Sequence, residues 1–338
     1  MFASSSEDNS IKIWTTQNSQ PNLFLNLYTL DNARGGHSNW VSSMIQIENT
    51  QLLASGSFDT SIKLWNVSSG GVSLVRTFDS TNGGHSFLVS DLVSLTNSSN
   101  ADGVLFASSS FDFTIKLWTS TRLLATFNAT NGGHTGIVWS LTSLANSSLL
   151  ASCSDDRTVK IWDVSMIRLK FTLASHTDKV VCLLSLSSSL LASGSHDRTV
   201  KVWSLTNNNN NASLLYTYTG HTDSVVTLAY ISGGTFFASG SADGSVKIWN
   251  YLQNRLVYTL NGMTSVVSLK SNNNNLLISG HEDGSTRIWN TSTGMIVYTF
   301  DRTNQGHAMS VISLETLNGG SLLVTGSDDD TIKLWSLA

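Results

Sequence analysis

The stretch FASSSEDNSIKIW (2–14) is the first of eight copies of one thirteen-residue pattern in this chain of 338 residues. The other copies are LASGSFDTSIKLW (53–65), FASSSFDFTIKLW (106–118), LASCSDDRTVKIW (150–162), LASGSHDRTVKVW (191–203), FASGSADGSVKIW (237–249), LISGHEDGSTRIW (277–289) and LVTGSDDDTIKLW (323–335). Their closing Trp residues are 40 to 53 residues apart, so the chain is built from one repeated unit. Each copy predicts two short antiparallel strands joined by a tight turn.

The turn carries an acidic residue in every copy. Ser or Thr follows two residues after it. The acidic residues are Asp8, Asp59, Asp112, Asp156, Asp197, Asp243, Asp283 and Asp329. Short polar side chains hydrogen-bond nearby backbone groups and stabilise such turns. Because the same placement occurs eight times, we predict a structural role for it and not eight active sites.

Each unit also contains two further strands. After the Trp comes a strand such as RLLATF (122–127), and after a Gly-His pair comes another such as SVVTLAYI (224–231). Five units have the pair, one has Ser175-His176 and another has Gly262-Met263. No sustained helical periodicity is present, so each unit is expected to form four strands.

With its Gly-His pair, its Ser-x-Asp turn and its closing Trp, the chain resembles the WD-repeat (WD-40 type) β-propeller family. The resemblance covers essentially all of the sequence, although the Trp-Asp pair that names the family occurs only at Trp162-Asp163. It implies an all-β fold and a single domain over 1–338, in which every four-stranded antiparallel sheet is one blade.

The resemblance also implies a hydrogen-bonded tetrad in each blade, made of His, the turn Asp, a Ser and Trp. A buried imidazole and a buried indole both need such partners. The predicted sets are His37/Asp59/Trp65, His85/Asp112/Trp118, His134/Asp156/Trp162, His176/Asp197/Trp203, His221/Asp243/Trp249 and His307/Asp329/Trp335. Met263 stands where the seventh His should be, so we expect that tetrad to be incomplete and its blade to be the weakest.

Two blade counts fit the order of the strands. If a unit is lettered a to d from the Gly-His pair, the first unit lacks strand a and the eighth lacks strand d. A seven-bladed closure would pair the strand at 22–30 beside residues 327–335 and leave 1–20 over. Eight blades retain the apolar residues of 2–14, whose exposure would cost about 1.5–3 kcal/mol for each large side chain. This burial favours eight.

Charge, cysteine spacing and the length of apolar runs exclude several classes of function. The net charge is −4, and eight of the 19 Lys and Arg residues occupy one repeat position, which argues against nucleic-acid binding. Cys153 and Cys182 lack metal-binding or redox spacing, and no cofactor motif or small-molecule site is evident. No apolar run reaches the ~18 residues of a membrane span, and no signal peptide is recognised. We expect a cytoplasmic, possibly nuclear, protein that is not secreted.

Two function classes remain open, an interaction scaffold and a propeller enzyme of hydrolase type. An enzyme should show a cluster of non-repeating polar residues near the axis. The singular polar residues are Asp91, Lys179, His196, Arg198 and His281, and they form no recognisable constellation. We therefore predict a non-enzymatic scaffold or adaptor that binds peptide segments of other proteins.

A partner site is predicted on the edge that carries the d–a loops and the b–c turns. Two positions sample this edge: the residue before the turn Asp, and the residue that opens strand a. Their apolar members fall in units two to four, and Phe87 may join them. The candidate residues are Trp40, Phe58, Phe87, Leu88, Phe111 and Ile137. A contiguous aromatic patch is typical of peptide-binding surfaces. The alternative is that these side chains pack beneath their own loops.

Overall fold

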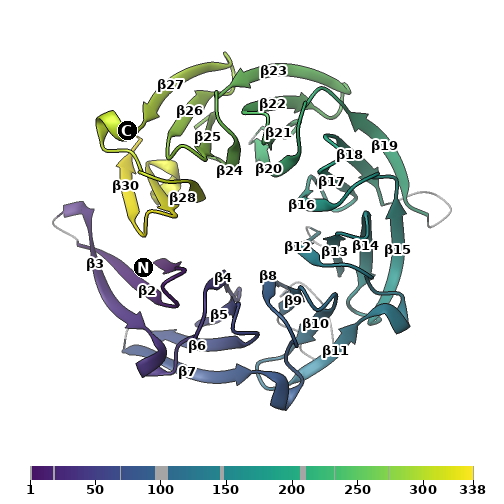
Figure 1. Ribbon diagram of the computed structural model, residues 1–338, viewed down its shortest axis with the longest axis vertical. Coiled ribbons are helices and arrows are strands. Elements are labelled where there is room, and N and C mark those ends of the chain that lie inside the picture. The colour runs from purple at the N-terminus through teal and green to yellow at the C-terminus, as the bar shows by residue number, and fades with distance from the viewer. Residues whose placement is uncertain are drawn as a thin grey trace. The chain divides into compact units, whose positions relative to one another are not determined.

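The computed structural model describes residues 2–17, 20–68, 70–95, 106–144, 148–205, 211–231, 233–272 and 274–337. The chain divides into two units, Met1–Ser175 and His176–Ala338, and each is described by itself. Every sheet corresponds to one expected blade, and we number the blades 1 to 8 in chain order (Figure 1).

The first unit contains blades 1 to 4. Its strands are β1 (Phe2–Ser5), β2 (Ile11–Gln17), β3 (Gln20–Leu30), β4 (Val41–Gln46), β5 (Leu52–Ser57), β6 (Ile62–Ser68), β7 (Gly71–Phe78), β8 (Val89–Ser94), β9 (Phe106–Ser110), β10 (Ile115–Trp118), β11 (Leu123–Phe127), β12 (Val138–Ser143), β13 (Leu149–Ser154), β14 (Thr158–Asp163) and β15 (Arg168–Ala174). Three d–a loops carry the 3-10 helices η1 (Asn32–Arg34), η2 (Ser80–Asn82) and η3 (Ala129–Asn131).

The second unit contains blades 5 to 8. Its strands are β16 (Val180–Ser185), β17 (Leu190–Ser195), β18 (Val200–Ser204), β19 (Ser213–Tyr218), β20 (Val225–Ile231), β21 (Phe236–Ser241), β22 (Ser245–Asn250), β23 (Arg255–Asn261), β24 (Val266–Ser271), β25 (Leu276–His281), β26 (Thr286–Asn290), β27 (Met295–Phe300), β28 (Val311–Leu317), β29 (Leu322–Ser327) and β30 (Ile332–Ser336). Its 3-10 helices are η4 (Arg302–Asn304) and η5 (Asn318–Gly320).

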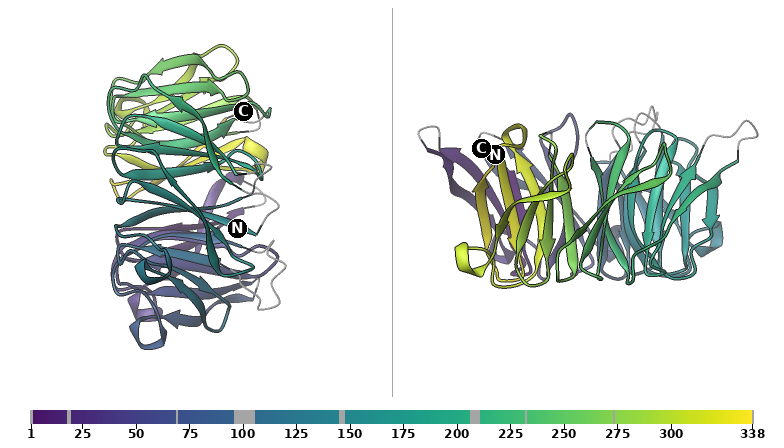
Figure 2. Two further views of the ribbon diagram at one scale, coloured as in Figure 1. Left: turned by 90° about the vertical axis from the view of Figure 1, so that its right-hand side faces the viewer. Right: turned by 90° about the horizontal axis from the view of Figure 1, so that it is seen from above.

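Within each blade the strands follow one another as antiparallel neighbours, as the repeat predicted. Blades 2 to 7 have four strands, blade 1 has β1–β2–β3 and blade 8 has β28–β29–β30. Because the strands alternate in direction, the d–a loops and b–c turns of a blade emerge at one end of its strands (Figure 2). In every copy of the turn, the Asp side chain accepts a hydrogen bond from the backbone N–H two residues later, for example Ser61 to Asp59 at 2.9 Å.

The seven-bladed alternative is wrong. The strand at 22–30 lies within β3, which pairs with β2 in its own blade, whereas β30 pairs with β29 among the described strands. Ile11 and Ile13 of β2 are fully buried against blade 2, where they share an apolar cluster with Trp65. The N-terminal copy of the repeat therefore forms a blade of its own, as its retained apolar residues indicated.

Successive blades within a unit pack through the closing Trp of one blade and the d strand of the blade before it. The ring centroids of Phe78 and Trp118 are 4.6 Å apart, and those of Phe127 and Trp162 are 4.3 Å apart. Tyr218 and Trp249 form the same contact at 4.9 Å in the second unit. In the described part of the chain, no helix is long and apolar enough to span a membrane.

Candidate functional site

Blade 4 shows the geometry of the predicted tetrad. His134 Nδ1 lies 2.8 Å from Asp156 Oδ2, and its Nε2 lies 2.8 Å from Ser152 Oγ. Trp162 Nε1 donates to the same Ser152 oxygen at 2.9 Å. A carboxylate can only accept, so Nδ1 carries the imidazole proton and Nε2 accepts from the serine hydroxyl. The chain of hydrogen bonds ties the d–a loop to strands b and c.

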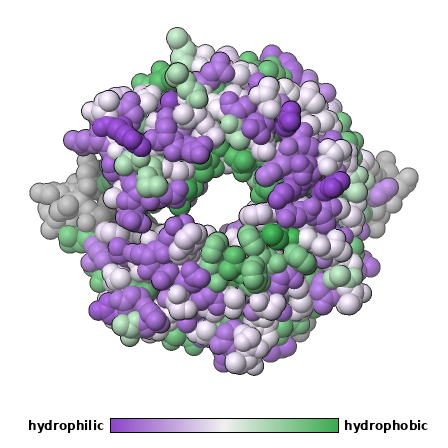
Figure 3. All heavy atoms as spheres, viewed as in Figure 1, coloured by the Kyte–Doolittle hydropathy of each residue, from purple (hydrophilic) through white to green (hydrophobic). Residues whose placement is uncertain are grey.

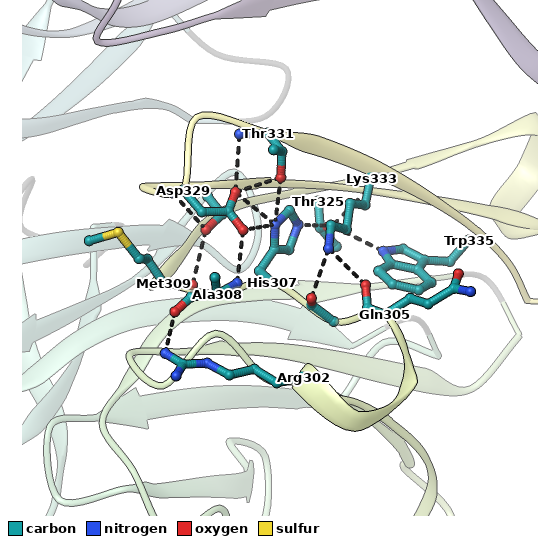
Figure 4. A network of polar contacts seen from close by, with 12 residues as sticks. Arg302, Gln305, His307, Ala308, Met309, Thr325, Asp329, Thr331, Lys333 and Trp335 are labelled. Carbon is teal, nitrogen blue, oxygen red and sulfur yellow. Dashed lines mark hydrogen bonds and ion pairs between the residues drawn. The ribbon is translucent and has the colours of Figure 1, made fainter.

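The same contacts join every other predicted set of His, Asp and Trp. The His–Asp distances are 2.9 Å for His37–Asp59 and His85–Asp112, 2.7 Å for His176–Asp197, and 3.0 Å for His221–Asp243 and His307–Asp329. The fourth member is Ser55, Ser108, Ser193, Ser239 or Thr325. Figure 4 shows the network of blade 8, in which Thr325 accepts from Trp335 and Lys333 donates to the carbonyls of Gln305 and Gly306.

Trp203, the closing Trp of blade 5, keeps this network. Trp203 Nε1 donates to Ser193 Oγ at 2.9 Å, and its ring lies edge-on to His176 with the centroids 6.4 Å apart. The side chain is 3% exposed.

Electrostatics and burial make these sets structural. Burial raises the pKa of the Asp156 carboxyl, but hydrogen bonds from His134, Thr158 and the Thr135 N–H outweigh it and hold the pKa well below its usual value. Burial lowers the pKa of His134, and the carboxylate opposes this shift without cancelling it. Ser152 has no solvent exposure, so no substrate reaches its hydroxyl.

Blade 7 takes the histidine of its network from an unexpected position. Met263 is 93% exposed, and His281, at the end of strand b, supplies the imidazole in its place. His281 Nε2 lies 2.9 Å from Ser279 Oγ, which accepts from Trp289 at 2.8 Å. Its Nδ1 bonds the Thr264 carbonyl at 3.0 Å, in place of a carboxylate. The tetrad with a carboxylate is thus incomplete in blade 7, as expected, but His281 supplies the imidazole that Met263 cannot.

Blade 7 still differs from its neighbours, because some of its buried polar atoms lack hydrogen-bond partners. Among the described residues, Thr286 Oγ1 and Arg287 Nη1 of this blade are buried without a hydrogen-bond partner. A buried polar atom that lacks a partner costs about 1–3 kcal/mol. That blade 7 is the weakest blade stays a prediction, which these atoms favour.

The aromatic residues predicted at the loop edge of blades 2 and 3 lie against one another. Trp40 and Phe58 stack with centroids 5.3 Å apart, Phe58 and Phe111 are 6.5 Å apart, and Phe87 and Phe111 are 6.4 Å apart. Trp139 of blade 4 adds an edge contact with Phe111 at 4.9 Å. We call these five residues the aromatic patch. Figure 3 shows apolar atoms gathered on this edge over β4, β8 and β9.

Backbone pairing brings the two compared positions together in blades 2 to 8. The N–H of Phe58 donates to the Trp40 carbonyl at 2.8 Å, and that of Phe111 donates to Leu88 at 2.9 Å. In blade 4 the same bond joins Asp155 to Ile137. The residue that opens strand a therefore always lies beside the residue that precedes the turn Asp.

Exposure separates the predicted patch residues into two groups. Trp40 is 42% exposed and Phe87 is 52% exposed, so their d–a loops leave both open to solvent. The other four predicted residues are half-buried: Phe58, Leu88, Phe111 and Ile137. Sequence reasoning missed Trp139 because it lies two residues beyond the compared position. The sequence did offer one signal for Trp139, since it is a Trp that does not close a copy of the repeat.

The paired positions of the second unit carry no Phe, Tyr or Trp. They are Lys179/His196, Ser224/Ala242, Ser265/Glu282 and Ser310/Asp328. Among the described residues, no group of three or more His, Cys, Asp and Glu side chains could hold a metal ion.

Asp91, the singular acid of blade 3, links the a strands of blades 2, 3 and 4. Its Oδ1 accepts from the Leu92 N–H at 2.8 Å and from Ser43 Oγ at 3.2 Å. Its Oδ2 accepts from the Leu141 N–H at 2.9 Å and from Ser140 Oγ at 3.2 Å. Burial raises the pKa of this carboxyl in spite of these bonds. Asp91 therefore holds strands together within the first unit.

Comparison with known proteins defines the class. The family described as WD domain, G-beta repeat (WD40) matches residues 26–66, 73–119, 122–163, 167–204, 212–250, 254–290 and 296–336. The chain belongs to this family and is an all-β protein of the β-propeller class with eight blades. The crystal structure of the computationally designed Ika8 protein is similar, with a TM-score of 0.80 and 25% identity over 99% of this chain and 92% of that one. No curated protein matches the chain.

Proposed function

We propose that this chain is a non-enzymatic protein–protein interaction scaffold, a subunit or adaptor of a larger complex, and that its aromatic patch binds a peptide segment of the partner. Membership of the WD40 family supports the general role, since proteins of this fold commonly bind other proteins. The patch supports the position of the site. The partner segment is hydrophobic or combines apolar with basic residues.

One observation carries this proposal: five aromatic rings form a continuous surface across three blades, and two of them are about half exposed. Aromatic side chains bury large areas with little loss of rotamer freedom, and they dominate the energetics of many interfaces. Phe58 and Phe111 lie beneath and between the exposed rings. They hold Trp40 and Phe87 in place for a ligand.

Carboxylates border the patch at two of its ends. Asp155 Oδ1 accepts a hydrogen bond from Trp139 Nε1 at 2.6 Å. At blade 1, Glu7 follows Ser6, whose carbonyl accepts from the N–H of Val41, next to Trp40. Negative charge at a binding surface favours the approach of basic partners and disfavours acidic ones. This charge supports Lys or Arg beside the apolar residues of the bound segment.

Selection of a library of short random peptides on the immobilised protein tests the site. We expect enrichment of peptides with aromatic or aliphatic residues beside Lys or Arg, and loss of their binding in the double variant Trp40→Ala/Phe87→Ala. Because both side chains are exposed, the melting temperature should change little. The half-buried pair Phe58→Ala/Phe111→Ala should also abolish binding, but its packing makes stability a necessary check.

Met166→Ala provides the matched control. Met166 is 64% exposed and lies in the first unit at the c–d turn of blade 4, at the other end of the strands. It should leave binding of the selected peptides unchanged. Peptides that bind Trp40→Ala/Phe87→Ala as tightly as the wild type would place the binding surface elsewhere.

A further inference from the structure

Phe113 is an exposed aromatic residue at the tip of the b–c turn of blade 3, two residues after Phe111 of the aromatic patch. Its N–H closes the turn by donating to the Ser110 carbonyl at 3.2 Å. Its side chain is 44% exposed. A phenyl ring contributes to stability mainly through the apolar area that it buries. The packing of blade 3 therefore does not explain why a phenylalanine stands here.

The backbone conformation of Phe113 makes the choice of residue costly. Its φ is 70°, in the left-handed region, where the Cβ of a bulky residue approaches the following carbonyl oxygen. Glycine and asparagine adopt this conformation most readily. Phe113 thus combines backbone strain with an exposed apolar side chain.

The other seven copies of the turn show what the position requires. All of them have a positive φ here, between 62° and 87°, and all of them carry glycine or a polar residue. The equivalent residues are Asn9, Thr60, Arg157, Arg198, Gly244, Gly284 and Asp330. The fold accepts several small or polar side chains at this position, and a large apolar one occurs only in the blade at the centre of the aromatic patch.

The repeat also shows which way the side chain leaves the backbone. A Cβ at Gly244 would lie 3.3 Å from the Thr264 nitrogen, and a Cβ at Gly284 would lie 2.9 Å from the Met309 carbonyl oxygen. Both contacts are with the d–a loop of the next blade. Because the same hydrogen bond closes all three turns, the Cβ of Phe113 is directed toward the loop that precedes blade 4. Trp139 of blade 4 already contacts Phe111 on that side.

We infer that Phe113 determines the specificity of the aromatic patch by binding a second apolar side chain of the partner segment. The inference rests on the function proposed for the patch. Strained residues persist at binding sites when the side chain is needed there. Trp40 and Phe87 are the exposed rings for the first apolar side chain, and Phe113 provides the surface for the second on the side of blade 4.

The geometry limits the spacing of the two apolar residues in the partner. The rings of Phe87 and Phe111 are 6.4 Å apart. The Cα atoms of Phe111 and Phe113 are at most about 7 Å apart, because two residues separate them. An extended peptide advances about 3.3 Å per residue. The two apolar residues of the segment should therefore be two to four positions apart.

Parallel selection of a library of short random peptides on the wild type and on Phe113→Asn tests the inference. Peptides selected on the wild type should carry two apolar residues at this spacing. Phe113→Asn should bind these peptides at least ~10-fold more weakly, as is usual for the loss of an aromatic contact at the centre of an interface. It should also raise the melting temperature by about 1–3 °C, because Asn relieves the left-handed strain.

Two variants provide controls. Thr60→Asn changes the same turn position in blade 2, where φ is 72°, and should raise the melting temperature without weakening peptide binding. Phe113→Tyr keeps the ring and should bind the selected peptides within ~3-fold of the wild type. A fall in the melting temperature of Phe113→Asn would show that the ring supports the fold, and would overturn the inference.

The binding outcomes separate this inference from the proposed function. Peptides that lose binding in Trp40→Ala/Phe87→Ala but not in Phe113→Asn would support the aromatic patch and overturn the role of Phe113. Peptides that lose binding only in Phe113→Asn would support Phe113 and place the rest of the surface elsewhere. No enrichment on the wild type, or binding that neither variant weakens, would overturn both.

Discussion

Blades 4 and 7 bury the same Trp–Ser hydrogen bond with histidines that come from different parts of the blade. In blade 4, His134 reaches Ser152 from the d–a loop and donates a hydrogen bond to Asp156. In blade 7, His281 reaches Ser279 from strand b. The loop from the glycine to strand a is one residue shorter in blade 7. The difference teaches that an imidazole nitrogen can reach the serine by two routes, from the d–a loop or from strand b.

A second difference concerns charge. His134 bonds a carboxylate, whereas His281 bonds a backbone carbonyl, and Asp283 is turned toward its own turn, where it accepts from the Ser285 N–H at 2.8 Å. A carbonyl stabilises a protonated imidazole less than a carboxylate does. Acid should therefore affect the two blades through different groups.

Removal of the blade 4 histidine should give the largest effect. His134→Ala leaves Ser152 and Asp156 each without one buried hydrogen bond and opens a cavity, so we expect a loss of about 2–3 kcal/mol in the free energy of unfolding. Urea denaturation measures it. Thr135→Ala, at the exposed neighbouring side chain, is the control and should change stability by less than ~0.5 kcal/mol. A loss as small as that for His134→Ala would contradict a stabilising tetrad.

Acid should reduce stability through His281 of blade 7, and this effect should be of intermediate size. Burial lowers the pKa of His281 to about 4, and the bond to the Thr264 carbonyl opposes the shift only in part. Since the unfolded imidazole titrates near 6.5, the unfolded state binds more protons between pH 6.5 and 4. The stability that neutral His281 provides is therefore complete above pH 6.5 and is lost as the pH falls toward 4.

The variant His281→Gln isolates this contribution, because its amide can accept from Ser279 and donate to the Thr264 carbonyl without titrating. Between pH 7.5 and pH 5, we expect the wild type to lose about 2 kcal/mol more than the variant in the free energy of unfolding. Urea titrations at the two pH values measure the difference. Equal losses would mean that His281 is not buried as a neutral base.

The smallest effect is expected at Met263, where comparison of the repeats shows that the usual histidine is missing. Met263→His adds a histidine at a 93% exposed position with a φ of 75°, while His281 already occupies the network. We expect a change of less than ~0.5 kcal/mol in stability, and no rescue of His281→Gln by Met263→His. A clear rescue would show that the shorter loop can deliver an imidazole to Ser279.

Repetition explains how much of the fold could be predicted. The strands, the turn at each Asp and the burial of each Trp depend on local spacing that occurs eight times, so a weak signal in one copy is reinforced by the others. The tetrads followed from the family resemblance, and the structure places each predicted His beside its Asp. In blade 7, His281 replaces the Ser that ends strand b elsewhere, and no local pattern indicates that its ring turns back to Ser279.

The aromatic patch was predictable in part for the same reason. Two repeat positions identified Trp40, Phe58 and Phe111, because backbone pairing brings those positions together in blades 2 to 8. Trp139 was missed since its side chain reaches Phe111 across a blade boundary, and such contacts depend on packing between blades. Which rings are exposed also depends on packing: Phe87 is 52% exposed, whereas Phe111 is half-buried beneath its neighbours.

The sequence by itself determined the repeat, its strands and its turn chemistry, because these depend on spacing of a few residues along the chain. The β-propeller class and the residues of each tetrad followed from the resemblance of these motifs to a known family. Only the tertiary structure decided that β3 pairs with β2 in blade 1, that His281 serves blade 7, and that five rings make one surface. Strand pairing and ring contacts depend on which apolar side chains are buried together. Those side chains come from residues far apart in the sequence.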